Sequence, residues 1–134
     1  MDLIEEKNIS KEFLFNILDR VYMSPTYDPD GDIMISETHD VYILIKEKQK
    51  CIKFMCVFQE NKELERKDLL EQTNEIVLDY PINAAIAANG GICFMQNIFF
   101  DGGVTEKNFV ITLKKFMSII TAIGTDQEFT LLEK

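Results

Sequence analysis

The chain has 134 residues, of which 46% are hydrophobic and 28% are charged, a composition that suits one folded domain and excludes a disordered or fibrous protein. Its 14 basic and 23 acidic residues give a formal net charge of −9 at pH 7, which disfavours binding to nucleic acid and anionic lipid. Apolar runs are shorter than the roughly 18 residues of a membrane helix, and the acidic start MDLIEEKN differs from a basic signal peptide. We therefore expect one cytoplasmic domain over residues 1–134 that binds neither nucleic acid nor a membrane.

The first predicted element is a helix near the N-terminus. Apolar residues recur at helical spacing after Ser10, which is a good N-cap, and Pro25 marks a stop. Residues 28–31, Asp-Pro-Asp-Gly, have turn chemistry. Their alternating aspartates resemble part of an EF-hand loop, but Ile33 and His39 stand where that loop needs glycine and glutamate. We therefore prefer a hairpin turn to a surface calcium site.

Three strands are predicted next. Residues 32–36, 41–46 and 51–59 are rich in β-branched and aromatic side chains, which favours an antiparallel meander. The third strand is apolar on both faces, as Phe54 and its neighbour Met55 illustrate. A strand with one water-facing side alternates more cleanly, so we expect a second layer, supplied by the first helix or by another subunit. The lysines around the preceding turn are interpreted as a solvated hairpin tip: Lys46, Lys48, Lys50 and Lys53.

The second half of the chain repeats the alternation of helix and strands. Helical spacing predicts a helix over residues 62–79, and two strands at 82–89 and 92–100 are joined by a tight turn at Gly90–Gly91. A last helix is predicted over 106–123, and its apolar arc is wider than one sheet contact needs. The order α-β-β-β-α-β-β-α is that of an α+β domain with helices packed on an antiparallel sheet. The tail, residues 124–134, is apolar enough to dock as well as fray.

This order, together with four sequence stretches, resembles the YbjN family. The stretches are DPDGDI, VYILI, YPINAAIAANGGI and FFDGGVTEKNF, within a core of about residues 10–123. The family's bacterial members are described as candidate sensory transduction regulators, and their fold is similar to that of type III secretion chaperones. The resemblance implies a non-enzymatic, usually dimeric protein that acts through protein contacts. It supplies no catalytic residues to transfer.

The reactive side chains do not form a recognisable catalytic set. Cys51, Cys56 and Cys93 are an odd number without paired short spacing, which argues against disulfides and a zinc site. The only histidine, His39, lies in a polar connector, whereas the cysteines lie within strands. Burial raises a thiol pKa, whereas nucleophilic catalysis needs it lowered. We expect buried thiols, no cofactor, no metal and no enzymatic activity.

Two aromatic residues on the first predicted helix are candidates for a partner surface. Phe15 and Tyr22 lie seven residues apart, on the side that otherwise carries Lys11 and Asp19. An exposed aromatic pair is typical of a protein interface. The alternative is that the C-terminal tail covers both. Ten Phe and six Met without any Trp also suit an adaptable binding surface, although core packing explains the same counts.

The stretch DGGVTEKNF, residues 101–109, suggests a second kind of site. Gly102, Gly103 and Thr105 could form an anion-binding nest at the start of the last helix. Against this, the preceding strand belongs to a predicted antiparallel hairpin, whereas phosphate loops of this kind occur in parallel sheets. Thr105 is better interpreted as a helix N-cap.

Three functions are compatible with these observations. The favoured hypothesis is a homodimeric protein-interaction module that binds a protein partner in a regulatory or chaperone-like role. The alternatives are a sensor of an anionic metabolite that uses the Gly-Gly turn, and a dedicated secretion chaperone. Similarity of fold alone does not choose between them.

Overall fold

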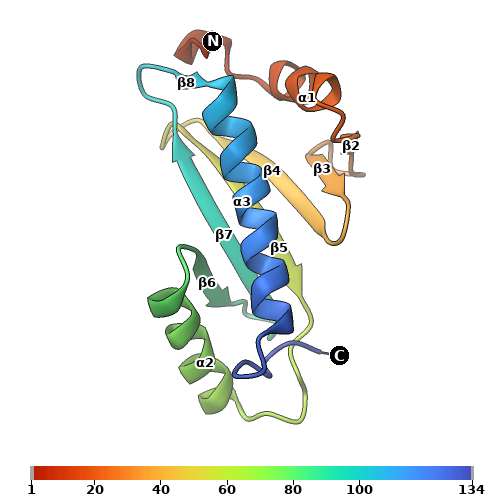
Figure 1. Ribbon diagram of the computed structural model, residues 1–134, viewed down its shortest axis with the longest axis vertical. Coiled ribbons are helices and arrows are strands. Elements are labelled where there is room, and N and C mark those ends of the chain that lie inside the picture. The colour runs from red at the N-terminus through yellow and green to blue at the C-terminus, as the bar shows by residue number, and fades with distance from the viewer. Residues whose placement is uncertain (1, 134) are drawn as a thin grey trace.

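A computed structural model, which describes residues 2–133, has the expected α+β architecture (Figure 1). Its main sheet is antiparallel throughout, with the strand order β2-β3-β4-β5-β7-β6. The strands are β2 (Thr26–Tyr27), β3 (Ile33–Ser36), β4 (Asp40–Lys46), β5 (Cys51–Phe58), β6 (Asn83–Ile86) and β7 (Ile92–Phe99). The helices are α1 (Lys11–Arg20), α2 (Arg66–Asp79) and α3 (Glu106–Thr125), with a short 3-10 helix η1 (Glu6–Asn8).

The predicted order of helices and longer strands is confirmed, and a small sheet is added to it. Strand β1 (Leu3–Ile4) pairs with β8 (Val104–Thr105) directly before α3. Two-residue strands carry too little periodicity to be recognised in the sequence. Their pairing brings the N-terminal segment to the start of the last helix.

Helix α1 begins and ends with specific capping contacts. The Ser10 side chain accepts a hydrogen bond from the Phe13 N–H, as expected for an N-cap. At the other end, the N–H of Met23 donates to the Leu18 carbonyl and that of Tyr22 donates to Asp19. This is the Schellman pattern, in which the residue at the position of Tyr22 is usually glycine. Tyr22 adopts a φ of 64° there, which strains a residue that has a Cβ.

The Asp-Pro-Asp-Gly sequence forms the predicted hairpin turn, between β2 and β3. The Asp28 N–H donates to the Asp32 carbonyl, and the Asp28 carboxylate accepts from the N–H groups of Asp30 and Asp32 at 2.9 and 2.8 Å. Gly31 has a φ of 84°. The Asp28 carboxylate, which would be a ligand in a calcium site, therefore closes the turn instead.

The start of α2 and the connection between β6 and β7 differ from their predicted boundaries. In both places, hydrogen bonds within a loop explain the difference. Helix α2 starts at Arg66, because Asn61 binds the C-terminal tail through its N–H and side chain, at 2.7 Å to Leu131 and 2.8 Å to Thr130. The predicted tight turn at Gly90–Gly91 is instead a loop of residues 87–91, closed by a hydrogen bond from the Ala87 N–H to the Gly91 carbonyl. The tail docks, since Phe129 and Leu131 are buried.

All three long helices pack on the same face of the sheet, which we call the inner face. Helix α3 lies along it, and α1 and α2 cover its two ends (Figure 1). The Phe54 ring at the centre of β5 lies 5.9 Å from that of Phe109 and 6.1 Å from that of Phe116 on α3, measured between ring centroids. One hydrophobic cluster includes residues from the three helices and from the inner face of the sheet.

Candidate partner-binding surfaces

The opposite face of the sheet, which we call the outer face, is also apolar. Because side chains alternate along a strand, the neighbours of the buried inner residues point outward. The register places Met34 opposite Tyr42, Tyr42 opposite Met55, and Met55 opposite Met95. These four residues, which we call the methionine row, run across four adjacent strands. Further apolar residues lie beside them: Leu44, Val57, Cys93 and Phe99.

The outer face has no covering layer among residues 2–133. The hydrophobic cluster beneath the helices contains no member of the methionine row. All four residues of the row are half-buried by their neighbours in the sheet, and Phe99 beside them is 68% exposed. An antiparallel sheet with one solvated face is normally polar on that face. The sequence left two sources for a second layer, the first helix or another subunit. Helix α1 packs on the inner face, so it is not that layer.

The structure separates the two aromatic residues that the sequence grouped as a partner surface. Phe15 is half-buried and stacks on Tyr27, with 4.5 Å between ring centroids. Tyr22 is 91% exposed. The C-terminal tail lies against α2 and the end of β5, where the Gln72 side chain accepts from the Thr130 N–H at 2.8 Å, and so it does not cover α1. Tyr22 alone remains an exposed candidate.

A third apolar region lies at the other end of the molecule. Helix α2 exposes Leu70, Val77 and Leu78, and Leu78 is 76% exposed. The adjacent strand β6 is the last strand of the sheet, and residues 82–91 contain no charged side chain. Natural sheet edges are commonly protected by charges or proline within the strand. This edge is therefore suited to a protein contact.

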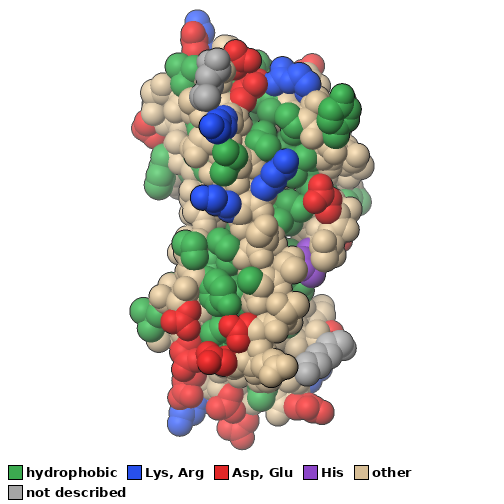
Figure 2. Space-filling view, viewed as in Figure 1, with side chains coloured by type: hydrophobic (Ala, Val, Ile, Leu, Met, Phe, Trp, Pro, Cys, Tyr) green, Lys and Arg blue, Asp and Glu red, His purple; other side chains and the backbone are tan. Residues whose placement is uncertain are grey.

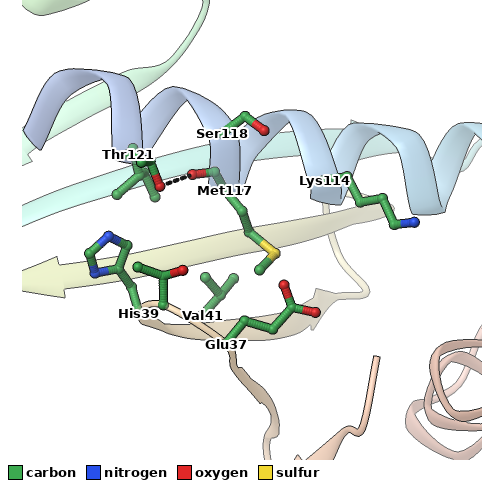
Figure 3. A pocket seen from close by; sticks show the side chains of 9 residues that line it. Glu37, His39, Val41, Lys114, Met117, Ser118 and Thr121 are labelled. Atoms are coloured by element: carbon green, nitrogen blue, oxygen red, sulfur yellow. Dashed lines mark hydrogen bonds between the residues drawn. The ribbon is translucent and has the colours of Figure 1, made fainter. Parts of the chain in front are cut away.

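A groove of about 520 Å³ lies beside α3 (Figure 3). Met117 points from the helix toward Val41 and Glu37, and Lys114 lies further along the helix (Figure 3). His39 also lines the groove, and its ring meets that of Phe58 edge-on at 5.0 Å. The only histidine is thus held by an aromatic contact at the end of the sheet.

The cysteines lie on both faces of the sheet. Cys56 points inward, where burial raises the pKa of its thiol to about 12. Cys93 lies on the outer face, and partial burial raises the pKa of its thiol above the usual range. A nucleophilic cysteine needs the opposite shift. In residues 2–133, no group of three or more His, Cys, Asp or Glu side chains is placed to hold a metal ion.

The Gly-Gly turn before α3 is already contacted by the chain itself. The Gly102 N–H donates to the Glu6 carboxylate at 2.9 Å, and that carboxylate pairs with Lys50 at 2.7 Å. The Lys50 hydrogen bond, followed by that of Gly102, holds the pKa of Glu6 below its usual range. Thr105 caps α3 by accepting from the Asn108 N–H. At Gly103, where φ is 102°, a Cβ would lie 2.7 Å from the Ile4 carbonyl oxygen. The absence of a side chain at this position therefore allows β1 to pack close to the turn.

Charge is distributed unevenly over the surface. Figure 2 shows acidic side chains gathered over α2 and basic ones in the upper half, where α3 begins. Ten acidic and three basic residues lie in 59–80 and 126–133, the segments at the α2 end. None of the helices described is long and apolar enough to cross a membrane.

Comparison with known proteins identifies the fold. At the level of sequence, no family model and no curated protein matches the chain. Among solved structures, it is similar to YbjN from E. coli, a candidate transcription regulator, with a TM-score of 0.76 over 94% of this chain and 97% of that chain at 16% identity. The chain has the YbjN fold. The resemblance carried by its sequence stretches is thus confirmed at the level of structure.

Two further structures share this fold. An uncharacterised protein from Methanothermobacter thermautotrophicus matches with a TM-score of 0.62 at 15% identity, over 85% of this chain and 93% of its own. A chain of the HopA1–SchA chaperone–effector complex matches with a TM-score of 0.59 at 15% identity, over 83% of this chain and 87% of its own. The predicted likeness to a chaperone fold is therefore also confirmed.

Proposed function

We propose that this chain is a non-enzymatic protein-interaction module. It acts in the cytoplasm as a homodimer and holds a protein partner on the outer face of its sheet, in a regulatory or chaperone-like role. The fold is shared with a candidate regulator and with a chain of a chaperone–effector complex. At 15–16% identity, this likeness concerns the fold alone.

The observation that carries the proposal is the uncovered methionine row. Met34, Met55 and Met95 are flexible, polarisable side chains that can adapt to a partner surface. Tyr42 adds a rigid aromatic of the kind enriched at binding hot spots. Large exposed apolar patches on folded proteins mark interaction sites. A partner layer here would complete the sheet in the way that α3 completes its inner face.

The proposed homodimer uses the α2 end of the molecule. A two-fold axis beside β6 would pair two edge strands and bring the exposed leucines of two α2 helices together, as a symmetric interface requires. Glu71 and Glu75 lie on α2 beside the exposed leucines. These carboxylates would repel their copies at the rim, so added salt should strengthen the dimer.

The absence of enzymatic activity is supported by the state of the reactive groups. The Cys56 thiol, with a pKa of about 12, is almost entirely protonated at neutral pH. The ring of His39, the only histidine, packs edge-on against Phe58. The N–H of Gly102, which an anionic metabolite would need, donates to Glu6. These contacts favour the interaction module over the metabolite sensor.

Co-purification from the native cell tests the partner-binding role. The bait is the wild type, the outer-face variant Met55→Glu, or the control Ile111→Glu, which places the same charge at an exposed site on α3. We expect a stoichiometric partner that is lost with Met55→Glu and retained with Ile111→Glu. A partner retained by both variants would place binding elsewhere, and the absence of any partner would refute the proposed role.

Sedimentation velocity tests the homodimer separately. We expect a dimer at micromolar concentration that becomes tighter as salt rises, and a monomer for Leu78→Glu. The matched control is Leu3→Glu, because Leu3 is also an exposed leucine but lies at the opposite end of the molecule. A wild-type monomer under all conditions would refute the dimer.

A further inference from the structure

The outer face contains a polar hollow next to the methionine row. It has a volume of about 520 Å³ and is lined by Lys46, Gln49, Cys51, Lys53, Asn97 and Phe99. Leu44, Lys53 and Asn97 lie side by side on three strands, one pleat along from the methionine row. Two residues along a strand span about 7 Å. Apolar and polar parts of one ligand segment could therefore reach both features.

The charge of this hollow is positive and unbalanced. Lys46 and Lys53 line it, and none of its described lining residues is acidic. Neither lysine makes an ion pair within residues 2–133. Lys50, in the same hairpin, shows the contrasting arrangement, because the Glu6 carboxylate lies 2.7 Å from its amine. Lys53 is half-buried between Leu44 and Asn97 on the neighbouring strands, and a partly desolvated ammonium group without a counter-ion favours an anionic partner.

A second copy of this chain, presented face to face, would not supply that anion. Such a pair would bring the lysines of one hollow toward those of the other, and like charges across an interface are repelled. The occupant that fits must combine an apolar surface with a carboxylate.

We propose that the outer face binds an amphipathic helix of another protein, whose apolar stripe packs on the methionine row and whose Asp or Glu side chain enters the hollow to pair with Lys53. The row crosses four strands and so spans about 14 Å, the length of about nine helical residues. A helix is also the element that covers the inner face of the same sheet. This inference rests on the proposed function and names the chemistry of the partner.

A displayed library of helical peptides provides the test. Its exposed positions vary among acidic, neutral, basic and apolar residues, and it is selected against the wild type, Lys53→Glu and Lys53→Met. We expect the wild type to select peptides with Asp or Glu within an apolar stripe. Replacing that residue by Asn or Gln should weaken binding about tenfold, and Lys53→Glu should select Lys or Arg instead. Circular dichroism and thermal unfolding verify that each variant is folded.

Four outcomes would overturn the inference. The first is that the selected peptides bind Met55→Glu as tightly as the wild type, the second is that they show no charge preference that follows residue 53, and the third is that no peptide is selected. Loss of the dimer in Met55→Glu would assign the face to a second copy and also overturn it. Each outcome is distinguishable from failure of the proposed function, because co-purification with the natural partner is measured independently of the peptides.

Discussion

The inner and outer faces of the sheet are built from the same strands and differ in what they contact. Phe54 and Met55 are adjacent in β5; the first is fully buried between Phe109 and Phe116, and the second lies in the uncovered methionine row. Both faces carry large apolar side chains, so hydrophobicity alone does not distinguish the core from an uncovered surface. The presence or absence of a covering helix makes the distinction: the covered face stabilises the fold, and the uncovered face is the one for which we propose partner binding.

The largest expected effect is the difference in stability between substitutions on the two faces. Phe54→Ala should lower the free energy of unfolding by about 3–5 kcal/mol, because it leaves a cavity beneath α3. Met55→Ala should lower it by less than about 1 kcal/mol, because the side chain is already partly hydrated. Urea denaturation measures both. Similar losses at the two positions would mean that the outer face is covered in solution.

Thiol reactivity should also differ between the inner and outer faces of the sheet. At pH 8, a pKa of about 12 leaves roughly one Cys56 thiol in ten thousand ionised. Cys93, on the outer face, should react at least about tenfold faster, because its thiol is more accessible. Peptide mass spectrometry after timed iodoacetamide labelling assigns the rates. Bound partner should slow the labelling of Cys93, and equal rates at the two sites would contradict the division.

A substitution at Tyr22 should change the free energy of unfolding by less than Phe54→Ala does, and in the opposite direction. Tyr22→Gly removes the strain of a left-handed residue at the end of α1 and should raise the free energy of unfolding by about 1 kcal/mol. Tyr22→Ala is the matched control, because it removes the ring and keeps the strain, so it should give no gain. Thermal unfolding compares the two. A destabilised glycine variant would show that the exposed ring contributes to the fold.

The smallest expected effect concerns the Glu6–Lys50 pair at the edge of the sheet. The pKa of Glu6 is lower in the folded chain than the usual glutamate value of 4.5, chiefly because Lys50 donates a hydrogen bond to its carboxylate. Its contribution to stability is therefore present above pH 4.5 and is lost as the pH falls through the lower, folded pKa. Glu6→Gln should be less stable than the wild type at pH 7, and the difference should vanish once the pH falls below the folded pKa of Glu6. A difference independent of pH would show that the charge is not responsible.

The sequence predicted the periodic elements and missed the contacts that depend on register. Helix α3 and strand β5 were recognisable because their apolar residues repeat over many positions. Met34 and Met95 were not, because only the pairing of separate strands places them beside Met55. The signal that did exist was the apolar character of both faces of β5. It indicated a second layer, and the placement of α1 on the inner face shows that α1 does not supply that layer.

The hollow on the outer face illustrates the same limit. Lys46 and Lys53 looked like part of a solvated hairpin tip, together with Lys50. In the structure Lys50 forms an ion pair with Glu6, which lies 44 positions away in the sequence. Lys46 and Lys53 instead share a hollow with Asn97 and Phe99 of β7. Composition predicted the charge of this region, whereas the environment of each lysine depends on tertiary contacts.

The central pairing of the sheet also has a consequence for how the chain folds. Strand β5 pairs with β7 along its whole length, from Cys51 opposite Phe99 to Phe58 opposite Ile92, and α2 and β6 lie between them in the sequence. During synthesis, the β3-β4-β5 meander therefore emerges with its β5 edge unpaired and with both faces apolar. Such an edge invites association with other chains. The pairing of β7 with β5 should therefore limit the folding rate, because this long-range contact forms more slowly than the local hairpins.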